Sequence, residues 1–473
     1  MSAPLFPPGF LFGAATSAYQ IEGSPAADGK GPSIWDTFVR RPGRVAGGQT
    51  GDVAAGAYRD FQTDVDIMRQ LGLNAYRFSV AWTRVLPAGR GAVNQRGLDY
   101  YDRLVDALLA AGLEPFLTLF HWDMPQALHE ALGGFAGREC AALFADYAEV
   151  VARRLGDRVT HWITLNEPWV HATLGHLRGL HAPGRHNPWA FLRVVHHQLL
   201  AHALAAPRLR AHSPAARVGL ALNLSPVYPL SDSEADRAAA RLGDAGLNRL
   251  FLDPLFRGHY PADLWPRLRP FHPPARPGDL AGLAGTVDFL GVNYYSRVRV
   301  RHAAHVPFLR LWPHGLPLAG HAAPLNPSPS PDAPERSAMG WEVYPAGLFE
   351  LLWRLKRDYG NPPLYVTENG AAFPDPPPVA GRVPDEARRR YLAQHLDVLA
   401  AALRAGVDAR GYFVWSLIDN FEWTYGYDKR FGLVYVDYAT QRRTIKDSGH
   451  WYGAFARQQT AAAGTSGPRA ASN

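Results

Sequence analysis

The stretch Leu364–Gly370 reads LYVTENG and decides the fold assignment. Its first residues are apolar or β-branched without interruption, which is typical of a strand buried on both faces. Asn369 and Gly370 follow, and this dipeptide is a common turn signal that ends a strand. Glu368 is therefore predicted to lie at the carboxyl-terminal end of a buried strand.

A second carboxylate ends a similar stretch earlier in the chain. Residues Val159–Leu165 (VTHWITL) suit another buried strand, and Asn166, Glu167 and Pro168 come next. Pro168 cannot extend a ladder of hydrogen bonds, so Glu167 is also predicted to end a strand. Taken alone, either glutamate could be an ordinary surface residue. Together they suit glycoside hydrolysis, in which one carboxyl group protonates the leaving oxygen and the other attacks the anomeric carbon or activates water.

The composition indicates a globular protein with a large core. Of the 473 residues, 47% are hydrophobic and 12% are aromatic, including 13 Trp. Length alone would suggest two or three domains, although α/β barrels run long as single domains. Composition does not choose between these two arrangements.

The net charge of +7 does not indicate a nucleic-acid partner. Only four of the 49 basic residues are lysines, and the arginines are spread among 42 acidic residues. This distribution is typical of solvated helix faces and not of a stripe that follows a phosphate backbone. We therefore expect no binding to nucleic acid.

The sequence predicts a cytoplasmic protein that does not enter a membrane. Cys140 is the only cysteine, which excludes an internal disulfide and a cysteine-based metal cluster, and an inert thiol on a helix is expected. The first residues have no basic region and their apolar run is broken by prolines, so a secretory signal is not expected. No run of about 18 apolar residues occurs, so no membrane span is predicted.

Strand and helix patterns alternate along the whole chain. The strand patterns are Phe10–Ala18, Asn74–Val80, Glu114–Phe120, Val159–Leu165, Arg217–Leu224, Val287–Tyr295, Leu364–Gly370 and Gly411–Ser416. The helix patterns are Tyr58–Leu71, Leu98–Ala111, Arg138–Leu155, Asn187–His212, Glu234–Leu250, Pro345–Tyr359, Asp385–Ala405 and Lys446–Arg457. Alternation implies a parallel sheet, and eight repeats imply closure into an α/β fold of the (β/α)8 TIM barrel type.

The segments outside these patterns are interpreted as long loops on one domain. A barrel needs roughly 250 residues, and most of the surplus follows strands, where barrel enzymes build their sites. Residues 301–339 are rich in Pro and Gly and could be a linker between domains, but the same alternation resumes after them. Residues 431–438 suit part of a hairpin. We therefore predict a single catalytic barrel over residues 1–457 and a disordered tail over 458–473.

Polar side chains that do not suit burial collect at the predicted strand ends. They are Gln20, Arg77, His121, Asn166, Glu167, Asn223, Asn293, Tyr295, Glu368, Asn369 and Glu422. A closed barrel brings these ends to one mouth, where such groups can hydrogen-bond a ligand rich in hydroxyls. Arg77 lies within a strand pattern and therefore needs a carboxylate partner.

Aromatic residues near the same ends could stack on the faces of a sugar ring, although a tryptophan taken singly suits the core better. They are Trp122, Trp341, Trp415, Trp423 and Phe431. The helical spacing of His196, His197 and His202 could suggest a metal site. Hydrogen bonds to solvent or to another helix are the preferred interpretation, because no carboxylate follows in the HExxH arrangement.

The sequence resembles glycoside hydrolase family 1, the retaining β-glycosidases of bacterial β-glucosidase type. Seven blocks appear in the family's order over about residues 6–457. They are FLFGAATSAYQIEG, NAYRFSVAW, LFHWDMPQAL, TLNEPW, VDFLGVNYYS, PLYVTENG and WSLIDNFEWTYGYDKRFGLVYVD. Residues 301–339 match no clear block, so the resemblance leaves the leaving-group preference open.

The resemblance implies a role for most of these side chains. Glu167 would be the acid/base and Glu368 the nucleophile, supported by Arg77 and Tyr295. Trp415 would form the floor under the sugar, and Trp341 would lie on the aglycone side. The remaining sugar contacts implied are Gln20, His121, Trp122, Asn166, Glu422 and Trp423. No metal or organic cofactor is required for this chemistry.

The leading hypothesis is a retaining exo-β-glycosidase (a β-glucosidase) that acts on small β-glycosides or short oligosaccharides and releases glucose, with galactose and fucose as alternative released sugars. One alternative is a 6-phospho-β-glycosidase. These enzymes resemble one another in having Ser, Lys and Tyr in the loop after the eighth strand. Those positions hold Glu422, Lys429 and Phe431, and Glu422 would repel a phosphate. A sugar-binding barrel without turnover is another alternative, and a plant-type thioglucosidase is disfavoured by Glu167. The sequence leaves open whether the chain is a monomer or a homo-oligomer.

Overall fold

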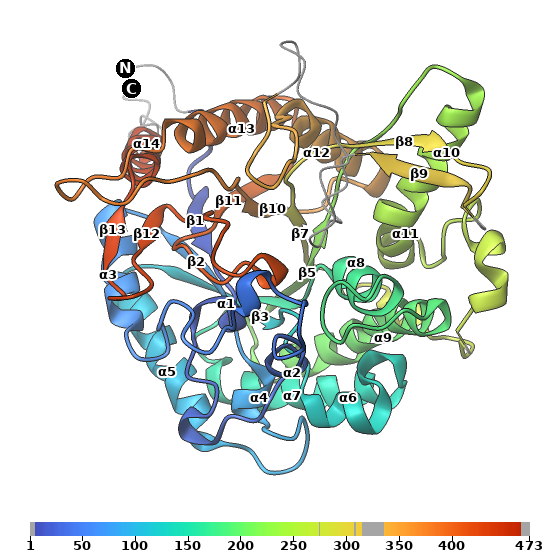
Figure 1. Ribbon diagram of the computed structural model, residues 1–473, viewed down its shortest axis with the longest axis horizontal. Coiled ribbons are helices and arrows are strands. Elements are labelled where there is room, and N and C mark those ends of the chain that lie inside the picture. Colours follow the sequence, from blue (N-terminus) through green and yellow to red (C-terminus); the bar gives the residue numbers. More distant parts are fainter. Residues whose placement is uncertain (1–4, 274, 307–308, 315–334, 465–473) are drawn as a thin grey trace, which may run out of the picture.

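The computed structural model describes residues 5–273, 275–306, 309–314 and 335–464. Eight strands of this part close into a parallel barrel in the order β1-β11-β10-β7-β5-β4-β3-β2, with helices around it (Figure 1). These strands are β1 (Leu11–Ala15), β2 (Ala75–Ser79), β3 (Glu114–Phe120), β4 (His161–Asn166), β5 (Arg217–Asn223), β7 (Phe289–Asn293), β10 (Leu364–Asn369) and β11 (Ala409–Trp415). The predicted (β/α)8 barrel is confirmed.

The barrel interior is filled by side chains and is not a channel. Its buried cluster mixes small and large residues, so that neighbouring strands interdigitate. Its members on the strands include Ala15, Ala75, Phe116, Ile163, Ala221, Phe289, Tyr365 and Phe413. The space for a ligand is therefore left to the mouth of the barrel and its loops.

The pairing register becomes irregular where the two predicted glutamates emerge. Strand β10 shifts between Val366 and Glu368 against β7, and β4 shifts between Ile163 and Asn166 against β5. Such irregularities re-aim side chains at the rims of barrels. Both glutamates thus leave the regular sheet at its carboxyl-terminal edge.

Each predicted helix has a counterpart around the barrel. The main helices are α3 (Phe61–Leu71), α5 (Gln95–Ala110), α7 (Glu139–Leu155), α9 (Pro188–His212), α10 (Glu234–Asp244), α11 (Leu250–Arg257), α12 (Ala346–Tyr359), α13 (Glu386–Arg404) and α14 (Asp447–Gly464). Local signals set several ends: the Asn187 side chain accepts from the backbone of Trp189 and Ala190 at the start of α9, and Gly72 ends α3 with a φ of 73°. Cys140 lies buried on α7, as an inert thiol would, and burial raises the pKa of that thiol.

Two helix predictions differ from the structure. The pattern over Glu234–Leu250 is interrupted by a π-helical segment, η5 (Ala245–Arg249), which separates α10 from α11. Helix α14 continues to Gly464, so the first residues of the predicted disordered tail are helical. Residues 465–473 of that tail lie outside the described part of the chain.

Shorter elements build the loops over the mouth. They are α1 (Ala18–Ile21), α2 (Ile34–Phe38), α4 (Trp82–Val85), α6 (Gln126–Leu132), α8 (Pro168–Val170), β6 (Val227–Pro229), β8 (Val298–His302), β9 (Leu311–His314), β12 (Val434–Val436) and β13 (Arg443–Ile445). Strands β12 and β13 pair antiparallel, so the predicted hairpin is present. The long loop predicted over 301–339 begins with regular structure, because β8 and β9 pair with each other and β8 also pairs with β6. Residues 315–334 of that loop are not described.

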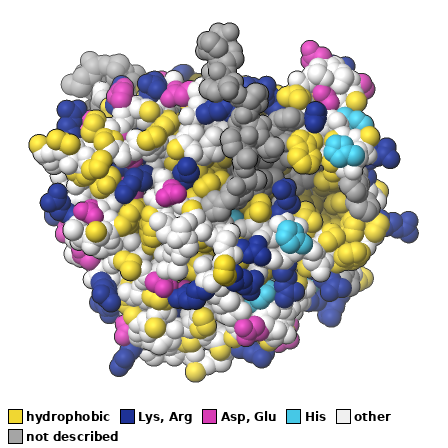
Figure 2. Space-filling view, in the orientation of Figure 1, with side chains coloured by type: hydrophobic (Ala, Val, Ile, Leu, Met, Phe, Trp, Pro, Cys, Tyr) yellow, Lys and Arg dark blue, Asp and Glu magenta, His cyan; other side chains and the backbone are white. Residues whose placement is uncertain are grey.

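The surface agrees with the expected distribution of charge. On the face seen in Figure 2, Lys and Arg side chains are scattered among acidic and neutral ones and do not form a single stripe. Within the described ranges, no helix is both long enough and apolar enough to cross a membrane.

Candidate active site

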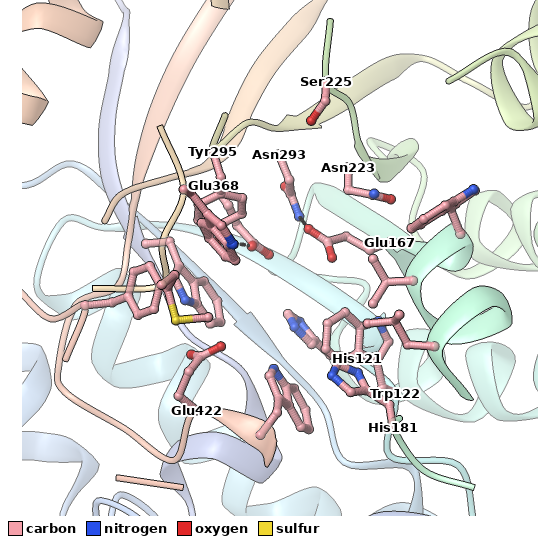
Figure 3. A pocket seen from close by; sticks show the side chains of 18 of the residues that line it. His121, Trp122, Glu167, His181, Asn223, Ser225, Asn293, Tyr295, Glu368 and Glu422 are labelled. Atoms are coloured by element: carbon pink, nitrogen blue, oxygen red, sulfur yellow. Dashed lines mark hydrogen bonds between the residues drawn. The ribbon is translucent and has the colours of Figure 1, made fainter. Parts of the chain in front are cut away.

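A pocket opens at the carboxyl-terminal mouth of the barrel and brings most of the predicted site residues together (Figure 3). Figure 3 shows Glu167 and Glu368 between Glu422 at one end and Ser225 at the other. The predicted residues that line it are His121, Trp122, Glu167, Asn223, Asn293, Tyr295, Trp341, Glu368, Trp415, Glu422, Trp423 and Phe431.

Glu368 lies at the end of β10 and is 3% exposed. Arg77 Nη1 donates to its Oε1 at 2.6 Å, and the Tyr295 hydroxyl donates to its Oε2 at 2.6 Å. Burial raises the pKa of Glu368, while Arg77 and Tyr295 oppose that rise. Glu368 is thus the carboxylate partner that Arg77 was predicted to need, and the positive charge of Arg77 favours the ionised form of Glu368.

Glu167 follows β4 and has a different environment. It is 6% exposed, and its Oε1 accepts from Asn293 Nδ2 at 2.8 Å. Burial, and then the negative charge of Glu368, raise the pKa of Glu167 to about 8. Glu167 is therefore suited to hold a proton at neutral pH, whereas Glu368 has a cationic partner.

Several site residues have an unusual backbone. Trp122, Glu167 and Trp423 have φ values of 78°, 44° and 46°, in the left-handed region that residues other than glycine rarely adopt. Such conformations persist where the surroundings hold them, and they cluster at functional sites. The Trp122 side chain is held by a hydrogen bond, in which its indole Nε1 donates to the Asn166 carbonyl oxygen at 2.9 Å.

Asn166 links the two glutamates to His121. Its Oδ1 accepts from Arg77 at 2.5 Å and from Asn293 at 3.0 Å, which fixes the orientation of the amide. The Asn166 amide nitrogen must then donate to His121 Nε2, 3.0 Å away. Burial and Arg77 hold the pKa of His121 well below its usual range, so the ring is neutral with its proton on Nδ1. That Nδ1 has no hydrogen-bond partner among the described residues and can donate to a ligand hydroxyl.

Glu422 forms the end of the pocket away from Ser225. Burial and the charge of Glu368 raise the pKa of Glu422 to about 8. Gln20 lies behind it, fully buried, and its Nε2 contacts Glu422 Oε2 at 3.4 Å and the Phe421 carbonyl at 3.0 Å. Gln20 thus orients this end of the pocket.

Four predicted residues do not line the pocket: Gln20, Arg77, Asn166 and Asn369. The first three contact residues that do. Asn369 faces away from the pocket, because its amide bonds the Tyr294 carbonyl, the Tyr391 hydroxyl and the Tyr412 hydroxyl. It therefore fixes the end of β10 from outside.

Sequence reasoning missed ten residues of the pocket wall. They are Trp169, Val170, Leu174, His181, Leu224, Ser225, Leu247, Met339, Thr424 and Tyr425. Trp169 follows Glu167 so closely that its position could have suggested it. Leu174 and Leu247 come from the π-helical segments η4 (His171–Leu177) and η5, which no sequence pattern indicated.

His196 and His202 hydrogen-bond residues of strand β4 and of loops, and not residues of another helix as expected. His196 bonds Tyr260 and Asp279, both at 2.9 Å. His202 bonds Thr164 at 2.8 Å and Thr286 at 3.1 Å. In the described part of the chain, no group of three or more His, Cys, Asp or Glu side chains could hold a metal ion.

Comparison with known proteins gives consistent matches over almost the whole chain. The model of glycosyl hydrolase family 1 matches residues 2–461. β-Glucosidase A of Thermotoga maritima is 45% identical over 96% of this chain and 98% of its own length. A bifunctional β-D-glucosidase/β-D-fucosidase of Bifidobacterium breve is 43% identical over 97% and 99%. The solved structure of a Thermotoga maritima β-glucosidase in complex with deoxynojirimycin superposes with a TM-score of 0.89 at 45% identity, over 96% of this chain and 99% of that chain.

Proposed function

The chain belongs to glycosyl hydrolase family 1, and on this premise we propose that it is a β-glucosidase that removes terminal β-D-glucosyl residues from β-glycosides. The retaining mechanism is general for this family. One relative is named for both β-D-glucosidase and β-D-fucosidase activity, so β-D-fucosides are proposed as further substrates.

The observation that carries the assignment of roles is the difference between the two glutamates. Glu368 contacts the Arg77 guanidinium, whereas the Glu167 carboxyl group accepts from the neutral amide of Asn293 and has its pKa raised to about 8. Pairs of carboxyl groups whose environments separate their pKa values take separate acid and base roles. We assign Glu167 as the acid/base and Glu368 as the nucleophile.

The reaction then proceeds in two displacements. Glu368 attacks the anomeric carbon while Glu167 gives its proton to the glycosidic oxygen, so the aglycone leaves as a neutral alcohol and a glycosyl ester remains on Glu368. Burial and the charge of Glu368 both raise the pKa of Glu167, and formation of the neutral ester removes the second of these causes, so that the pKa of Glu167 falls. The Glu167 carboxylate can then accept a proton from water, which attacks the anomeric carbon and releases the sugar with its original configuration.

Binding of the sugar is assigned to the groups around the two glutamates. His121 Nδ1, Asn293 and Glu422 offer hydrogen bonds, and Trp415 lies near them, with its ring 5.7 Å from the His121 ring. Gln20 and Asn166 are proposed to act here as well, through Glu422 and His121. Trp341 is proposed to contact the aglycone.

The 6-phosphosugar alternative has less support. Glu422 lines the pocket, and a carboxylate there would repel a phosphate dianion. Lys429 is not part of the pocket wall, and its Nζ lies 5.8 Å from the centre of the Tyr425 ring.

We also propose a single catalytic domain over residues 1–457 and a cytoplasmic location. Cell fractionation would test the location.

The test is a panel of nitrophenyl glycosides that vary in sugar and in anomeric configuration. The β-glucoside is expected to be hydrolysed, with weaker turnover of the β-fucoside or β-galactoside and none of the α-glucoside. A Glu368→Ala variant, purified in the same way, controls for contaminating glycosidases. Binding of deoxynojirimycin without turnover of any member over a broad pH range would contradict the proposal and favour a sugar-binding barrel.

A further inference from the structure

Six ionisable side chains form a buried network beside the pocket, behind the loop that follows β11. Three are acidic and three are basic, so their charges balance. They are Asp375, Asp385, Asp419, Arg388, Arg430 and Lys446. The Arg430 side chain is 18% exposed, and the other five are exposed by 1% or less. None of the six lines the pocket, and the mechanism above uses none of them.

Lys446 joins the loops that follow two neighbouring barrel strands. Its Nζ lies 2.6 Å from Asp375 Oδ2, in the loop after β10, and 2.7 Å from Asp419 Oδ1, in the loop after β11. Arg388 on α13 adds a second link, because its terminal nitrogens contact Asp375 at 3.0 and 2.9 Å and one of them donates to the Arg430 carbonyl oxygen at 2.8 Å. The loop that carries Glu422, Trp423 and Phe431 is thus tied to the loop that follows Glu368.

The network holds the backbone on both sides of Phe431. Arg388 Nη2 donates to the carbonyl oxygen of Arg430 at 2.8 Å, and the Gly432 N–H donates to Asp419 Oδ1 at 3.0 Å. Only glycine permits this approach, because a Cβ at position 432 would lie 2.2 Å from the backbone nitrogen of Asp419. The peptide units before and after Phe431 are therefore each fixed by a buried charged group.

Phe431 itself is part of the pocket wall. Its ring lies 6.3 Å from that of Tyr295 and 6.3 Å from that of Trp341, measured between centroids. Tyr295 in turn donates to Glu368. A displacement of Phe431 would therefore change the packing of a ring that supports Glu368 and of a ring on the wall of the pocket.

We propose that this network positions Phe431, which makes Lys446, Asp419 and Arg388 positioning residues for the reaction. Stability alone does not account for such a network, because well-packed apolar residues often replace buried ion pairs without loss of stability. Apolar packing is not directional, whereas hydrogen bonds to the Arg430 carbonyl and the Gly432 N–H fix two peptide units in place. Burial of these charged groups costs desolvation energy, but their hydrogen bonds fix the position of the pocket wall.

The test is a double-mutant cycle with Lys446→Met and Phe431→Ala, with turnover of nitrophenyl β-glucoside as the measurement. If Lys446 acts through Phe431, Lys446→Met alone should raise KM by about tenfold with little change in kcat, and it should change KM by less than about twofold in the Phe431→Ala background. Equal effects in both backgrounds would overturn the proposal, since a general loss of packing is additive with Phe431→Ala. Because the proposal relies on the proposed function only for its readout, absence of turnover by the unmodified protein would refute that function and not the network.

Two further variants keep this experiment decisive. Arg382→Met is the control. Arg382 lies in the loop after β10 and forms an exposed ion pair with Asp447, and the loss of this pair should leave KM unchanged. If Lys446→Met does not accumulate as folded protein, the pair Lys446→Met/Asp375→Asn removes one charge of each sign and takes its place in the cycle. Circular dichroism and the melting temperature of every variant establish that it is folded before its KM is compared.

Discussion

Arg77 on β2 binds Glu368 on β10 across the barrel mouth, with Nη1 and Oε1 2.6 Å apart. The two strands are not neighbours, because β1 and β11 lie between them. The Arg77 side chain is 1% exposed and also contacts Asn166, which bonds His121. One buried cation therefore fixes the charge of the proposed nucleophile and the position of a proposed sugar-binding group.

Removal of this cation should shift the pH dependence of turnover. In Arg77→Met the ionised form of Glu368 loses its partner, so the pKa of Glu368 rises and the acid limb of kcat/KM moves to higher pH. A hydrogen bond to a charged group contributes roughly 1.5–3 kcal/mol, so we expect about a tenfold to a hundredfold loss of kcat/KM. Tyr295→Phe removes a neutral donor to the same carboxylate and should shift the limb less. Equal acid limbs in Arg77→Met and the unmodified protein would contradict this role.

The alkaline limb should report Glu167. The acid must be protonated in the first step, and burial together with Glu368 raises the pKa of Glu167 to about 8. Activity is therefore expected to be present below that pH and to fall as pH rises through it, although the two glutamates titrate as a coupled pair. In Glu368→Gln the neighbouring charge is absent, so the pKa of Glu167 should fall. Carbon-13 NMR titration of labelled glutamate measures this shift directly, and a pKa unchanged by the substitution would show that the two groups do not interact.

Azide should distinguish the two carboxyl groups by the product it gives. In Glu368→Ala hydrolysis should be nearly abolished, and azide should restore turnover by attack from the vacated face, which yields the α-glycosyl azide. In Glu167→Ala the rate of hydrolysis should fall most for substrates with poor leaving groups, because proton donation to the leaving group contributes a factor of about 10²–10⁴ in rate. Azide should then give the β-glycosyl azide. NMR of the products checks both expectations, and the opposite pattern would exchange the two roles.

Much of the barrel and of the site could be predicted, because the apolar strands and the polar residues at their ends are both visible in the sequence. Parallel strands are buried on both faces, so a polar residue such as Glu368 or Asn293 at the end of an apolar run stands out. Arg77 could likewise be paired with a carboxylate from its burial alone. The closed barrel then places all these residues at one mouth without further information.

The rest of the site depends on local geometry that the sequence does not encode in a regular pattern. Leu174 and Leu247 reach the pocket from π-helical segments, whose wider turns have no distinct hydrophobic period. Strand β9 contains Pro313, which argues against a strand by propensity, yet it pairs with β8 at the edge of a small sheet. Gln20, expected to bind the sugar, lies on α1 and is buried beside Glu422, an arrangement that the sequence alone did not indicate.

Glu422 should decide between a free sugar and a 6-phosphosugar. Its carboxylate lines the end of the pocket, is 8% exposed and is supported by Gln20, so a ligand that reaches this end must hydrogen-bond it. In the free protein burial and Glu368 raise the pKa of Glu422 to about 8, and hydroxyl groups of a sugar that donate to it favour its ionised form, whereas a phosphate dianion would bring like charges together. We therefore expect nitrophenyl β-glucoside to have a much higher kcat/KM than its 6-phosphate. Glu422→Ser should lower kcat/KM for the unphosphorylated substrate by more than the roughly 1–3 kcal/mol of an ordinary unsatisfied hydrogen bond, because the lost acceptor is charged. The same variant should reduce the discrimination against the 6-phosphate, since the repulsion by Glu422 is removed. A preference of the unmodified protein for the phosphorylated substrate would overturn the assignment of a free glucoside.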